Sequence, residues 1–369
     1  MRVLILANYS AGLYKFRREL LETLLREQHE VHISLPNGEY VPQMEQMGCV
    51  FHDTPFNRHG TNPLKELQLL RYYQKLLHEV KPDIVLTYTI KPNIYGGMAC
   101  ARAGVPYIAN VTGLGTSIEN PGMLQRIVLR LYRAGLKKAR VVFFQNEGNR
   151  HFFEEHGIVR GKRELLPGSG VNANYHAFAP YPEDTEALVF STVGRIMRDK
   201  GCVELAVAAR RVKQKHPEVR FRLIGSFDED CPVQLREAIA SGVLEHIENQ
   251  RDVRPFYAES HAIIHPSYHE GMSNVLLEAA AAGRPVLASN VPGCRETFDE
   301  GVSGMGFEPR NVDDLVRAIE QFIALPHEQK ATMGCAGREK VEREFDRKIV
   351  VDAYMKEIQK IEERKHAAL

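Results

Sequence analysis

The sequence of 369 residues lacks several features that mark common protein classes. It contains no apolar run of about 18 residues, so we expect no transmembrane helix. The apolar run near its start is too short for a signal peptide and carries no cleavage pattern. The formal net charge is +1, which provides no overall field that would favour nucleic acid. We therefore expect a cytoplasmic protein that binds no nucleic acid and meets any membrane from the cytoplasmic side.

Metal and cofactor signatures are missing as well. The 6 cysteines are scattered without a CxxC pair or a zinc spacing, as is typical of reduced thiols. No GxGxxG dinucleotide fingerprint and no Walker A phosphate loop occur. His265 and His269 lie four residues apart, but Pro266 prevents an uninterrupted helix that would pair them on a metal. The sequence thus predicts no cofactor and no metal.

Short apolar runs alternate with longer segments of helical period along the whole chain. This alternation predicts α/β architecture, with parallel sheets covered by helices on both faces. The expected strands span residues 3–7, 31–35, 84–87, 107–110, 141–145, 189–193, 220–224, 262–265 and 285–288. The expected helices span residues 13–28, 63–80, 93–104, 121–138, 147–156, 201–215, 232–241, 274–282, 312–324, 327–344 and about 347–364.

A turn-rich break divides this alternation into two series. Residues 166–170 read LPGSG, and the irregular stretch that follows contains Pro180 and Pro182. We therefore expect two Rossmann-like, doubly wound domains that face an interdomain cleft, residues 1–168 and 187–346, joined by a linker at 169–186. The last helical stretch, within 347–369, follows a domain that is already complete, so we expect it to cross back onto the first domain.

Two glutamates eight residues apart frame the segment from Glu270 to Glu278, EGMSNVLLE. The segment begins as a turn and ends with a helical pattern, which places backbone N–H groups at a helix N-terminus, where phosphate binds. Eight residues are close to a whole number of helical turns, so we expect both carboxylates on one face. Because carboxylates also bind sugar hydroxyls, the segment predicts a sugar-nucleotide site.

Small and basic residues follow several expected strands, where ligands of α/β sheets bind. Gly194, Arg195 and Lys200 follow the expected strand 189–193. The two cations could clamp a diphosphate, although ordinary surface charge explains them as well. Gly225 ends another strand and Gly12 follows the first one; an ordinary turn accounts for either.

A basic stripe distinguishes the expected helix 121–138. The cations recur at spacings of four, three, four and three residues, and no acidic residue lies at i,i+4, so like charges repel along the stripe. An anionic partner, either a phospholipid surface or a lipid diphosphate, would relieve that repulsion, whereas a solvated face is the alternative. The stripe consists of Arg126, Arg130, Arg133, Lys137 and Arg140; Leu124, Ile127, Val128, Leu131 and Leu136 line another face, and Lys15, Arg17 and Arg18 could add to the basic patch.

In this order, these parts resemble the retaining glycosyltransferases of family 4, which have the GT-B architecture. The resemblance covers nearly the whole chain, and the stretch from Pro292 to Glu296 is a further characteristic part of it. Residues 13–17 and the TGLG sequence at 112–115 look like those of bacterial enzymes that extend polyprenyl-diphosphate-linked glycans. These include N-acetylgalactosaminyltransferases of protein glycosylation and their O-antigen and capsule relatives.

The resemblance implies a role for each matching residue. Arg195 and Lys200 would hold the donor diphosphate without a metal, Glu270 the donor sugar and Glu278 the ribose. Further donor contacts would come from Gly12, Gly194, Gly225, Gly271, Met272, Ser273, Asn274 and Val275, and acceptor contacts from Lys15, Arg17, Thr112, Arg126, Arg130 and Arg133. The sequence departs from the family in having Ala11 before Gly12, and Thr112 where many members carry a histidine.

The resemblance therefore predicts a retaining, metal-independent hexosyltransferase. It would move a hexose or N-acetylhexosamine from a UDP-sugar to a polyprenyl-diphosphate-linked saccharide, as a peripheral protein on the anionic inner face of a bacterial cytoplasmic membrane. A UDP-sugar 2-epimerase of the same architecture, or a non-catalytic donor-binding subunit, is the alternative.

Overall fold

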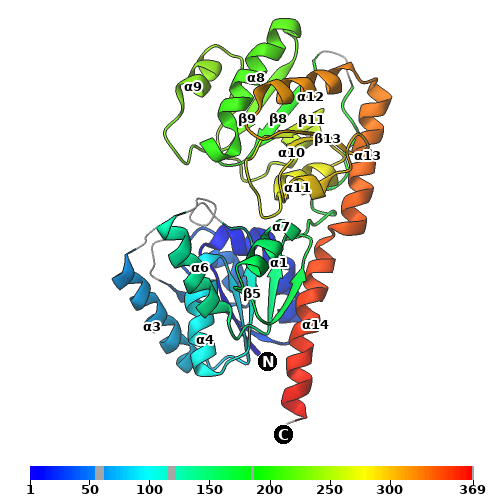
Figure 1. Cartoon of the computed structure of the whole chain (residues 1–369). Coiled ribbons are helices and arrows are strands. Elements are labelled where there is room, and N and C mark those ends of the chain that lie inside the picture. Colours follow the sequence, from blue (N-terminus) through cyan, green and yellow to red (C-terminus); the bar gives the residue numbers. More distant parts are fainter. Residues whose placement is uncertain (55–61, 115–121, 184–186, 368–369) are drawn as a thin grey trace. The chain divides into compact units, whose positions relative to one another are not determined.

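The computed structural model describes residues 1–54, 62–114, 122–183 and 187–367. The chain forms two compact units (Figure 1). Unit 1 contains Met1–Ser169 together with Arg347–Leu369, and unit 2 contains Gly170–Asp346.

Unit 1 is built on a seven-stranded sheet in the order β3-β2-β1-β4-β5-β6-β7. Every neighbouring pair is parallel; Val3 of β1, for example, pairs with Val31 of β2 and Ile84 of β4. The strands are β1 Arg2–Leu6, β2 Glu30–Leu35, β3 Val50–Asp53, β4 Ile84–Tyr88, β5 Tyr107–Val111, β6 Val141–Phe144 and β7 Lys162–Leu165.

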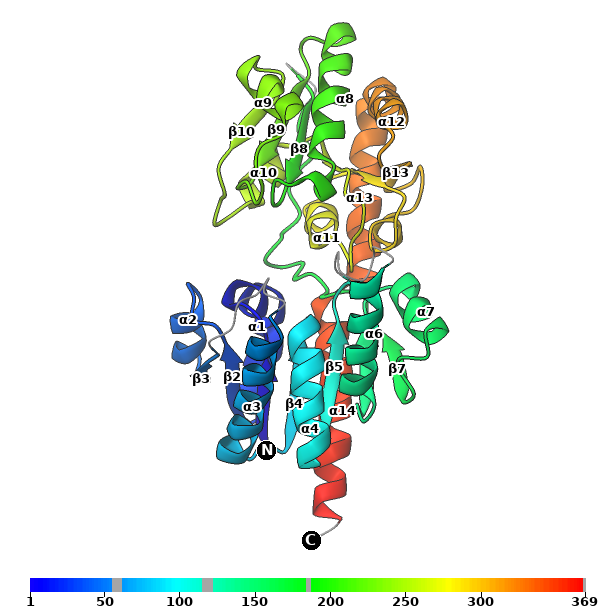
Figure 2. The same ribbon diagram turned by 60° about the vertical axis from the view of Figure 1, so that its left-hand side comes forward.

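Helices cover both faces of this sheet, because successive strand residues point to opposite sides. Ile5 packs in the core with α1 and α14, whereas its neighbour Leu4 packs with α3 and α4. Figure 2 shows α3, α4 and α6 side by side. The helices are α1 Ser10–Arg26, α2 Val41–Gln46, α3 Pro63–Val80, the π-helical η1 Pro92–Gly96, α4 Gly97–Ala103, α6 Met123–Leu136, α7 Glu147–Glu155 and α14 Arg347–His366.

Unit 2 repeats the plan with a six-stranded parallel sheet in the order β10-β9-β8-β11-β12-β13. Its strands are β8 Val189–Val193, β9 Arg220–Ile224, β10 Glu245–Ile247, β11 Ala262–His265, β12 Val286–Ser289 and β13 Gly304–Phe307. Its helices are η2 Arg198–Lys200, α8 Cys202–Lys215, α9 Val233–Ala240, α10 Arg254–Glu259, α11 Asn274–Ala281, η3 Arg295–Thr297, α12 Val312–Ala324 and α13 His327–Glu344.

The predicted doubly wound α/β fold is confirmed, and all nine expected strands are present. Sequence reading missed the four short strands β3, β7, β10 and β13 and the short helices α2 and α10. It also expected one helix over 93–104, which is instead divided between η1 and α4. The expected helix at 13–28 begins earlier, at Ser10, so the predicted loop around Gly12 is the first turn of α1.

Candidate functional site

The segment from Glu270 to Glu278 leads into α11, but only its second half is helical. Ser273 is the N-cap residue, and its hydroxyl accepts a hydrogen bond from the Leu276 N–H at 3.4 Å. Glu270 therefore lies in the non-helical approach to α11, whereas Glu278 lies within the helix. The expectation that both carboxylates share one helical face is wrong, because the helix begins only after Ser273, between the two glutamates.

Glu270 binds two partners from other strand ends of unit 2. The Lys200 ammonium lies 2.5 Å from Glu270 Oε1, and His265 Nε2 lies 2.9 Å from the same oxygen. The Glu270 side chain is 16% exposed, so its charge is largely removed from water. Burial on its own raises the pKa of the Glu270 carboxyl, but Lys200 and His265 outweigh it and hold that pKa well below its ordinary range. We call Lys200, His265 and Glu270 the Glu270 cluster.

The loops that carry the Glu270 cluster are fastened to one another. Lys200 also donates to Ser267 Oγ at 3.4 Å, and the Tyr268 N–H donates to the Asp199 carbonyl at 2.9 Å. Lys200 belongs to η2, after β8, while Ser267 and Tyr268 follow β11, the neighbouring strand. The cluster is therefore held by hydrogen bonds between two neighbouring loops of unit 2.

Glu278 has a different partner. The Tyr257 hydroxyl donates to Glu278 Oε2 at 2.9 Å, and His176 Nε2 lies 3.9 Å from Glu278 Oε1. Burial raises the pKa of Tyr257 well above its ordinary value, and the Glu278 charge adds to this, so the phenol stays a donor. The bond orients the carboxylate that the resemblance assigns to the ribose.

Sequence reading assigned no site role to His265 or Tyr257, which hydrogen-bond Glu270 and Glu278. His265 ends the expected strand 262–265, and such a strand-end position could have marked it as a site residue. Tyr257 gave no comparable signal, because it lies 21 residues before Glu278 and meets it only through the fold.

The N-terminal turn of α11 offers fewer phosphate donors than expected. The Ser273 N–H donates to the Gly293 carbonyl at 2.7 Å, so it is already used. A Cβ on Gly293 would stand 2.7 Å from the Glu270 carbonyl oxygen, and its φ is +84°, so both space and conformation require glycine there. The N–H groups of Asn274 and Val275 lie in the first helical turn, where no preceding carbonyl of the helix reaches them.

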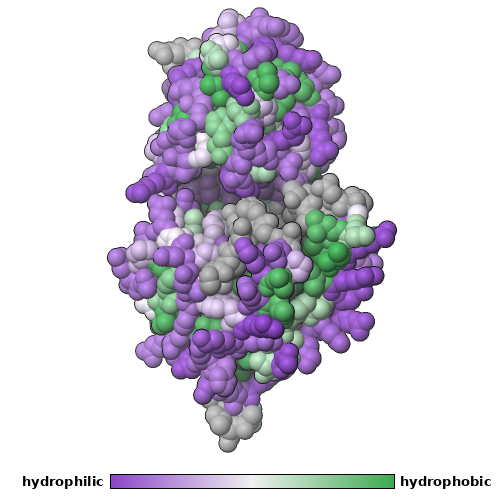
Figure 3. Space-filling model, turned by 90° about the vertical axis from the view of Figure 1, so that its left-hand side faces the viewer, coloured by the Kyte–Doolittle hydropathy of each residue, from purple (hydrophilic) through white to green (hydrophobic). Residues whose placement is uncertain are grey.

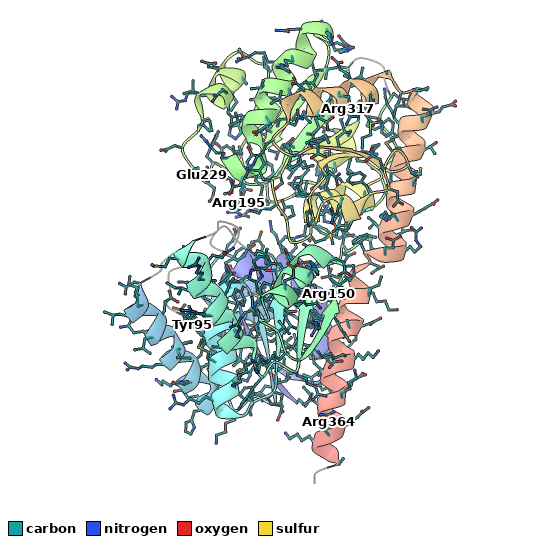
Figure 4. The ribbon with its side chains drawn as sticks, in the orientation of Figure 1. Tyr95, Arg150, Arg195, Glu229, Arg317 and Arg364 are labelled. Atoms are coloured by element: carbon teal, nitrogen blue, oxygen red, sulfur yellow. The ribbon has the colours of Figure 1, made fainter. Side chains whose placement is uncertain are left out.

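Arg195 follows β8 and pairs with an acidic residue. Its Nη1 lies 2.5 Å from Asp228 Oδ2, on the loop after β9, and both side chains are about half exposed (51% and 44%). Figure 4 shows Arg195 and Glu229 projecting from these neighbouring loops. A Cβ on Gly225 would stand only 1.8 Å from the Gly194 carbonyl oxygen, so close backbone packing between the loops explains this glycine. Gly271 and the buried Met272 belong to the turn before α11.

In unit 1, two predicted site residues occupy unexpected surroundings. Gly12 lies in the first turn of α1, where a Cβ would stand 2.5 Å from the Tyr9 ring. Arg17 is only 4% exposed, and its guanidinium lies 5.2 Å from the ring centre of Tyr88 and 6.0 Å from that of Tyr354. The expectation that Arg17 joins a surface basic patch is wrong, because two tyrosines of the core enclose it.

The remaining expected acceptor contacts lie at the surface. Lys15 is exposed, with its ammonium 5.5 Å from the centre of the Tyr40 ring. Thr112 directly follows β5 and is partly buried. Gly115, the last residue of the TGLG sequence, lies outside the described residues.

The basic stripe on α6 is shorter than expected. Arg126, Arg130 and Arg133 are exposed on α6, and Arg133 donates to the His156 carbonyl at 2.6 Å. Arg140 lies beyond the end of α6, and its Nε stands 3.8 Å from Glu357 of α14, so it does not extend the stripe.

The apolar face of α6 is also only partly covered. Met123, Leu124 and Ile127 are 79%, 49% and 46% exposed, whereas the buried residues of α6 all belong to its second half. We call Met123, Leu124, Arg126, Ile127 and Arg130 the α6 surface.

Two further findings concern the described part of the chain. Within it, no group of three or more His, Cys, Asp or Glu side chains is placed to hold a metal ion. None of its helices is both long and apolar enough to cross a bilayer.

The chain is similar to known glycosyltransferases in both sequence and fold. Residues 176–340 match the family described as glycosyl transferases group 1, and residues 2–146 match the glycosyl transferase 4-like family. It is 25% identical to the N,N'-diacetylbacillosaminyl-diphospho-undecaprenol alpha-1,3-N-acetylgalactosaminyltransferase of Campylobacter jejuni, over 96% of this chain and 98% of the relative. It is 26% identical to the capsular polysaccharide biosynthesis glycosyltransferase CapM of Staphylococcus aureus, over 90% of each chain.

Solved structures share the whole fold. A glycosyltransferase from Rickettsia africae superposes with a TM-score of 0.78 at 19% identity, over 98% of each chain. Anabaena Alr3699/HepE, in complex with UDP and glucose, superposes with a TM-score of 0.78 at 18% identity, over 98% of this chain and 99% of that one. With both halves matched and the fold shared, the chain belongs to the family 4 glycosyltransferases of GT-B architecture and is a transferase enzyme.

Proposed function

We propose that this glycosyltransferase is retaining and metal-independent, and that it moves a hexose or N-acetylhexosamine, of N-acetylgalactosamine type, from a UDP-sugar to a polyprenyl-diphosphate-linked saccharide. Such a reaction would serve bacterial surface-glycan or glycoprotein-glycan assembly. The observation that carries the proposal is the Glu270 cluster beside the N-terminus of α11, where a cation, a carboxylate and helical N–H groups meet. The Campylobacter relative, whose name describes transfer to a lipid diphosphate, supports the acceptor class.

The donor chemistry follows from the charges of unit 2. During transfer the bond between the sugar C1 and the UDP oxygen breaks, and a bond from C1 to the acceptor oxygen forms on the same face. The acceptor proton leaves with the departing phosphate, on which negative charge grows. Lys200 and Arg195 would neutralise that charge in place of a metal. The first N–H groups of α11 would donate hydrogen bonds to the same phosphate.

Glu270 and Glu278 would bind hydroxyls rather than move protons. Lys200 and His265 keep Glu270 ionised, and a carboxylate with such a low pKa is a poor base near neutral pH. An ionised carboxylate accepts hydrogen bonds from a sugar at full strength. Glu278, oriented by Tyr257, would bind the ribose in the same way.

The acceptor would be bound by unit 1. Arg126, Arg130 and Arg133 are exposed on one helix and would hold the acceptor diphosphate, because guanidinium groups match phosphate geometry. Thr112 and Lys15 would lie near the acceptor saccharide. We place the enzyme on the inner face of a bacterial cytoplasmic membrane, where a lipid-linked acceptor would be anchored.

The test is transfer from a panel of UDP-sugars to polyprenyl-diphosphate-linked acceptors, read as a mass increase of the acceptor. We expect one hexose or N-acetylhexosamine to be added, with the donor's anomeric configuration kept in the product's NMR couplings. The rate should persist in EDTA. A sugar inverted at C2 and released without acceptor would instead assign an epimerase, and donor binding with no turnover would assign a non-catalytic subunit.

A further inference from the structure

The beginning of α6 has an apolar face that unit 1 leaves largely uncovered. Met123, Leu124 and Ile127 occupy its first two turns, with 79%, 49% and 46% of their surface exposed. The spacing of 123, 124 and 127 places these three side chains on one side of the helix. Amphipathic helices of globular proteins normally turn their apolar face toward the core. In α6 the buried residues are Tyr132, Gly135 and Leu136, all in the second half.

A neighbouring helix exposes apolar side chains at the same end of the unit. Leu64 and Leu67, in the first two turns of α3, are 71% and 44% exposed. Both α3 and α6 pack against α4 and η1. Each runs back from the carboxyl edge of a parallel sheet, so both helices begin at that edge. Figure 3 shows hydrophobic and hydrophilic side chains next to each other on this face of unit 1.

The charged side chains along α6 all have one sign. Arg126 and Arg130 lie between and beyond the exposed apolar residues of α6, and no Asp or Glu occurs in the sequence from 120 to 146. Within the part of the chain that the structure describes, neither arginine forms an ion pair. An apolar strip flanked by cations complements an anionic lipid surface, where acyl chains lie beneath negatively charged headgroups.

We infer that the α6 surface docks on an anionic lipid bilayer, with Met123, Leu124 and Ile127 entering the headgroup boundary, so that Arg126 and Arg130 reach the acceptor diphosphate at the level of the lipid phosphates. Leu64 and Leu67 of α3 add a second, smaller contact. The inference rests on the proposed function, because a lipid-linked acceptor has to be reached at a membrane. The inference identifies the residues that contact the lipid. It also includes apolar contacts, which the basic stripe alone does not provide.

The experiment compares two matched triple variants by co-sedimentation with vesicles. One carries Met123→Ser, Leu124→Ser and Ile127→Ser. The control carries Val233→Ser, Val302→Ser and Ile349→Ser, which remove apolar side chains that are 60%, 58% and 40% exposed elsewhere. Vesicles contain phosphatidylglycerol with phosphatidylcholine, or phosphatidylcholine alone. Melting curves and sedimentation velocity establish that both variants are folded and report their oligomeric state.

We expect the wild type and the control to bind the anionic vesicles alike. The α6 variant should bind at least 100-fold more weakly, because each half-exposed apolar side chain contributes roughly a tenfold partition. Binding of the wild type to neutral vesicles should be weaker by about fivefold for each cation near the surface. Equal vesicle binding by both variants would overturn the inference, and so would a wild-type dimer that only the α6 variant dissociates, since a second copy would then be the occupant.

A transfer assay with a short-chain, water-soluble acceptor keeps the two proposals apart. We expect the α6 variant to transfer sugar to it at the wild-type rate, because Met123, Leu124 and Ile127 take no part in the proposed donor or acceptor contacts. Vesicle binding without any transfer by the wild type would sink the proposed function and leave the docking surface standing. Transfer without vesicle binding would do the reverse.

Discussion

The Glu270 cluster in unit 2 and the α6 surface in unit 1 both gather charge near a helix N-terminus, yet they are built in opposite ways. In the cluster, each charge has a partner within the unit: Lys200 and His265 both lie within hydrogen-bond distance of one oxygen of Glu270. On the α6 surface the arginines are exposed, and apolar side chains between them are exposed too. A preformed ion pair indicates a site that orients a small ligand, whereas uncompensated charge with uncovered apolar surface indicates a large external partner.

The energetic cost of the two arrangements supports this reading. Burying an ion pair loses hydration that the attraction between the charges only partly restores, so well-packed apolar residues would often be as stable. Exposing three large apolar side chains also lowers solubility without stabilising the fold. Stability alone explains neither arrangement, whereas the binding roles proposed above give a physical reason for each.

The largest expected effect is the loss of transfer rate when the Glu270 cluster loses its cation, and a second substitution distinguishes this loss from a loss of stability. Lys200→Met leaves the Glu270 carboxylate largely buried without its ammonium partner, which should cost about 3 kcal/mol of unfolding free energy. Adding Glu270→Gln to this variant should restore most of that loss. Transfer should nevertheless stay about 10³-fold slower in both variants, because the charge that stabilises the leaving diphosphate is missing.

Melting curves of the full chain and initial transfer rates measure the two quantities side by side. If the double variant recovers transfer together with stability, the cluster is structural and the comparison with the α6 surface fails. Ser226→Ala, on the loop after β9 and outside the cluster, serves as a control that should leave the transfer rate unchanged.

The second largest effect concerns the cations of α6. Replacing Arg126, Arg130 and Arg133 with Gln should raise the KM for a lipid-diphosphate acceptor in detergent by about 100-fold, since each cation contributes on the order of 1 kcal/mol toward an anionic partner. The affinity for UDP, measured by calorimetry, should not change. The difference from wild type should shrink as salt is raised, because exposed charges are screened.

The matched control replaces exposed cations of α8, namely Arg210, Arg211 and Lys215, with Gln. Each of these lies within ion-pair distance of an acidic side chain of unit 2. Equal losses of acceptor affinity in the two triple variants would show that only the overall charge matters, and would remove the special role of α6.

Much of the fold could be predicted from the sequence, for a reason visible in particular strands. β1 and β6 contain the continuous apolar runs VLIL and VVFF because helices bury both their faces. The missed strands β3, β7 and β10 have the sequences VFHD, KREL and EHI, and each stands at or beside a sheet edge. An edge strand needs no uninterrupted apolar run, so hydrophobicity alone does not reveal it.

The site was predictable only in part, because spacing gives position along the chain and not what lies opposite. The sequence marks Lys200 by its place after a strand, and Glu270 and Glu278 by their eight-residue spacing around a helix start. The strand-end position of His265 is a local signal, but Tyr257 meets Glu278 only through the packing of α10, which no local pattern contains. The same limit explains α6: its period correctly separates an apolar side from a basic one, but Leu124 and Ile127 face outward instead of toward a core.

A smaller effect should follow from the Tyr257 hydroxyl. Tyr257→Phe removes the hydrogen bond that orients Glu278, so the dissociation constant for UDP should rise about tenfold while kcat changes less than twofold. Tyr268→Phe is the matched control, since its hydroxyl donates to Glu204 in the same unit at 2.7 Å. Similar losses of UDP affinity in both variants would mean that general loosening of unit 2, rather than the position of Glu278, is measured.

The smallest effect distinguishes the two regions by pH. The folded protein holds the pKa of Glu270 well below its ordinary value, so the unfolded chain binds the proton first as pH falls. The stability that Glu270 contributes is therefore fully present above the unfolded carboxyl pKa of about 4.3 and is lost below it, as pH falls toward the depressed folded value. The melting temperatures of wild type and Glu270→Gln should converge as pH falls below about 4.3, by roughly 3 °C for each kcal/mol lost.

The triple arginine variant of α6 makes the contrasting case. Arginine does not titrate in this range, so the difference in melting temperature between this variant and wild type should show no such convergence. A difference that converges equally in both variants would mean that the acid sensitivity lies in other carboxyls. The buried Lys200–Glu270 pair would then not be the feature that distinguishes the acid sensitivity of unit 2 from that of the α6 surface.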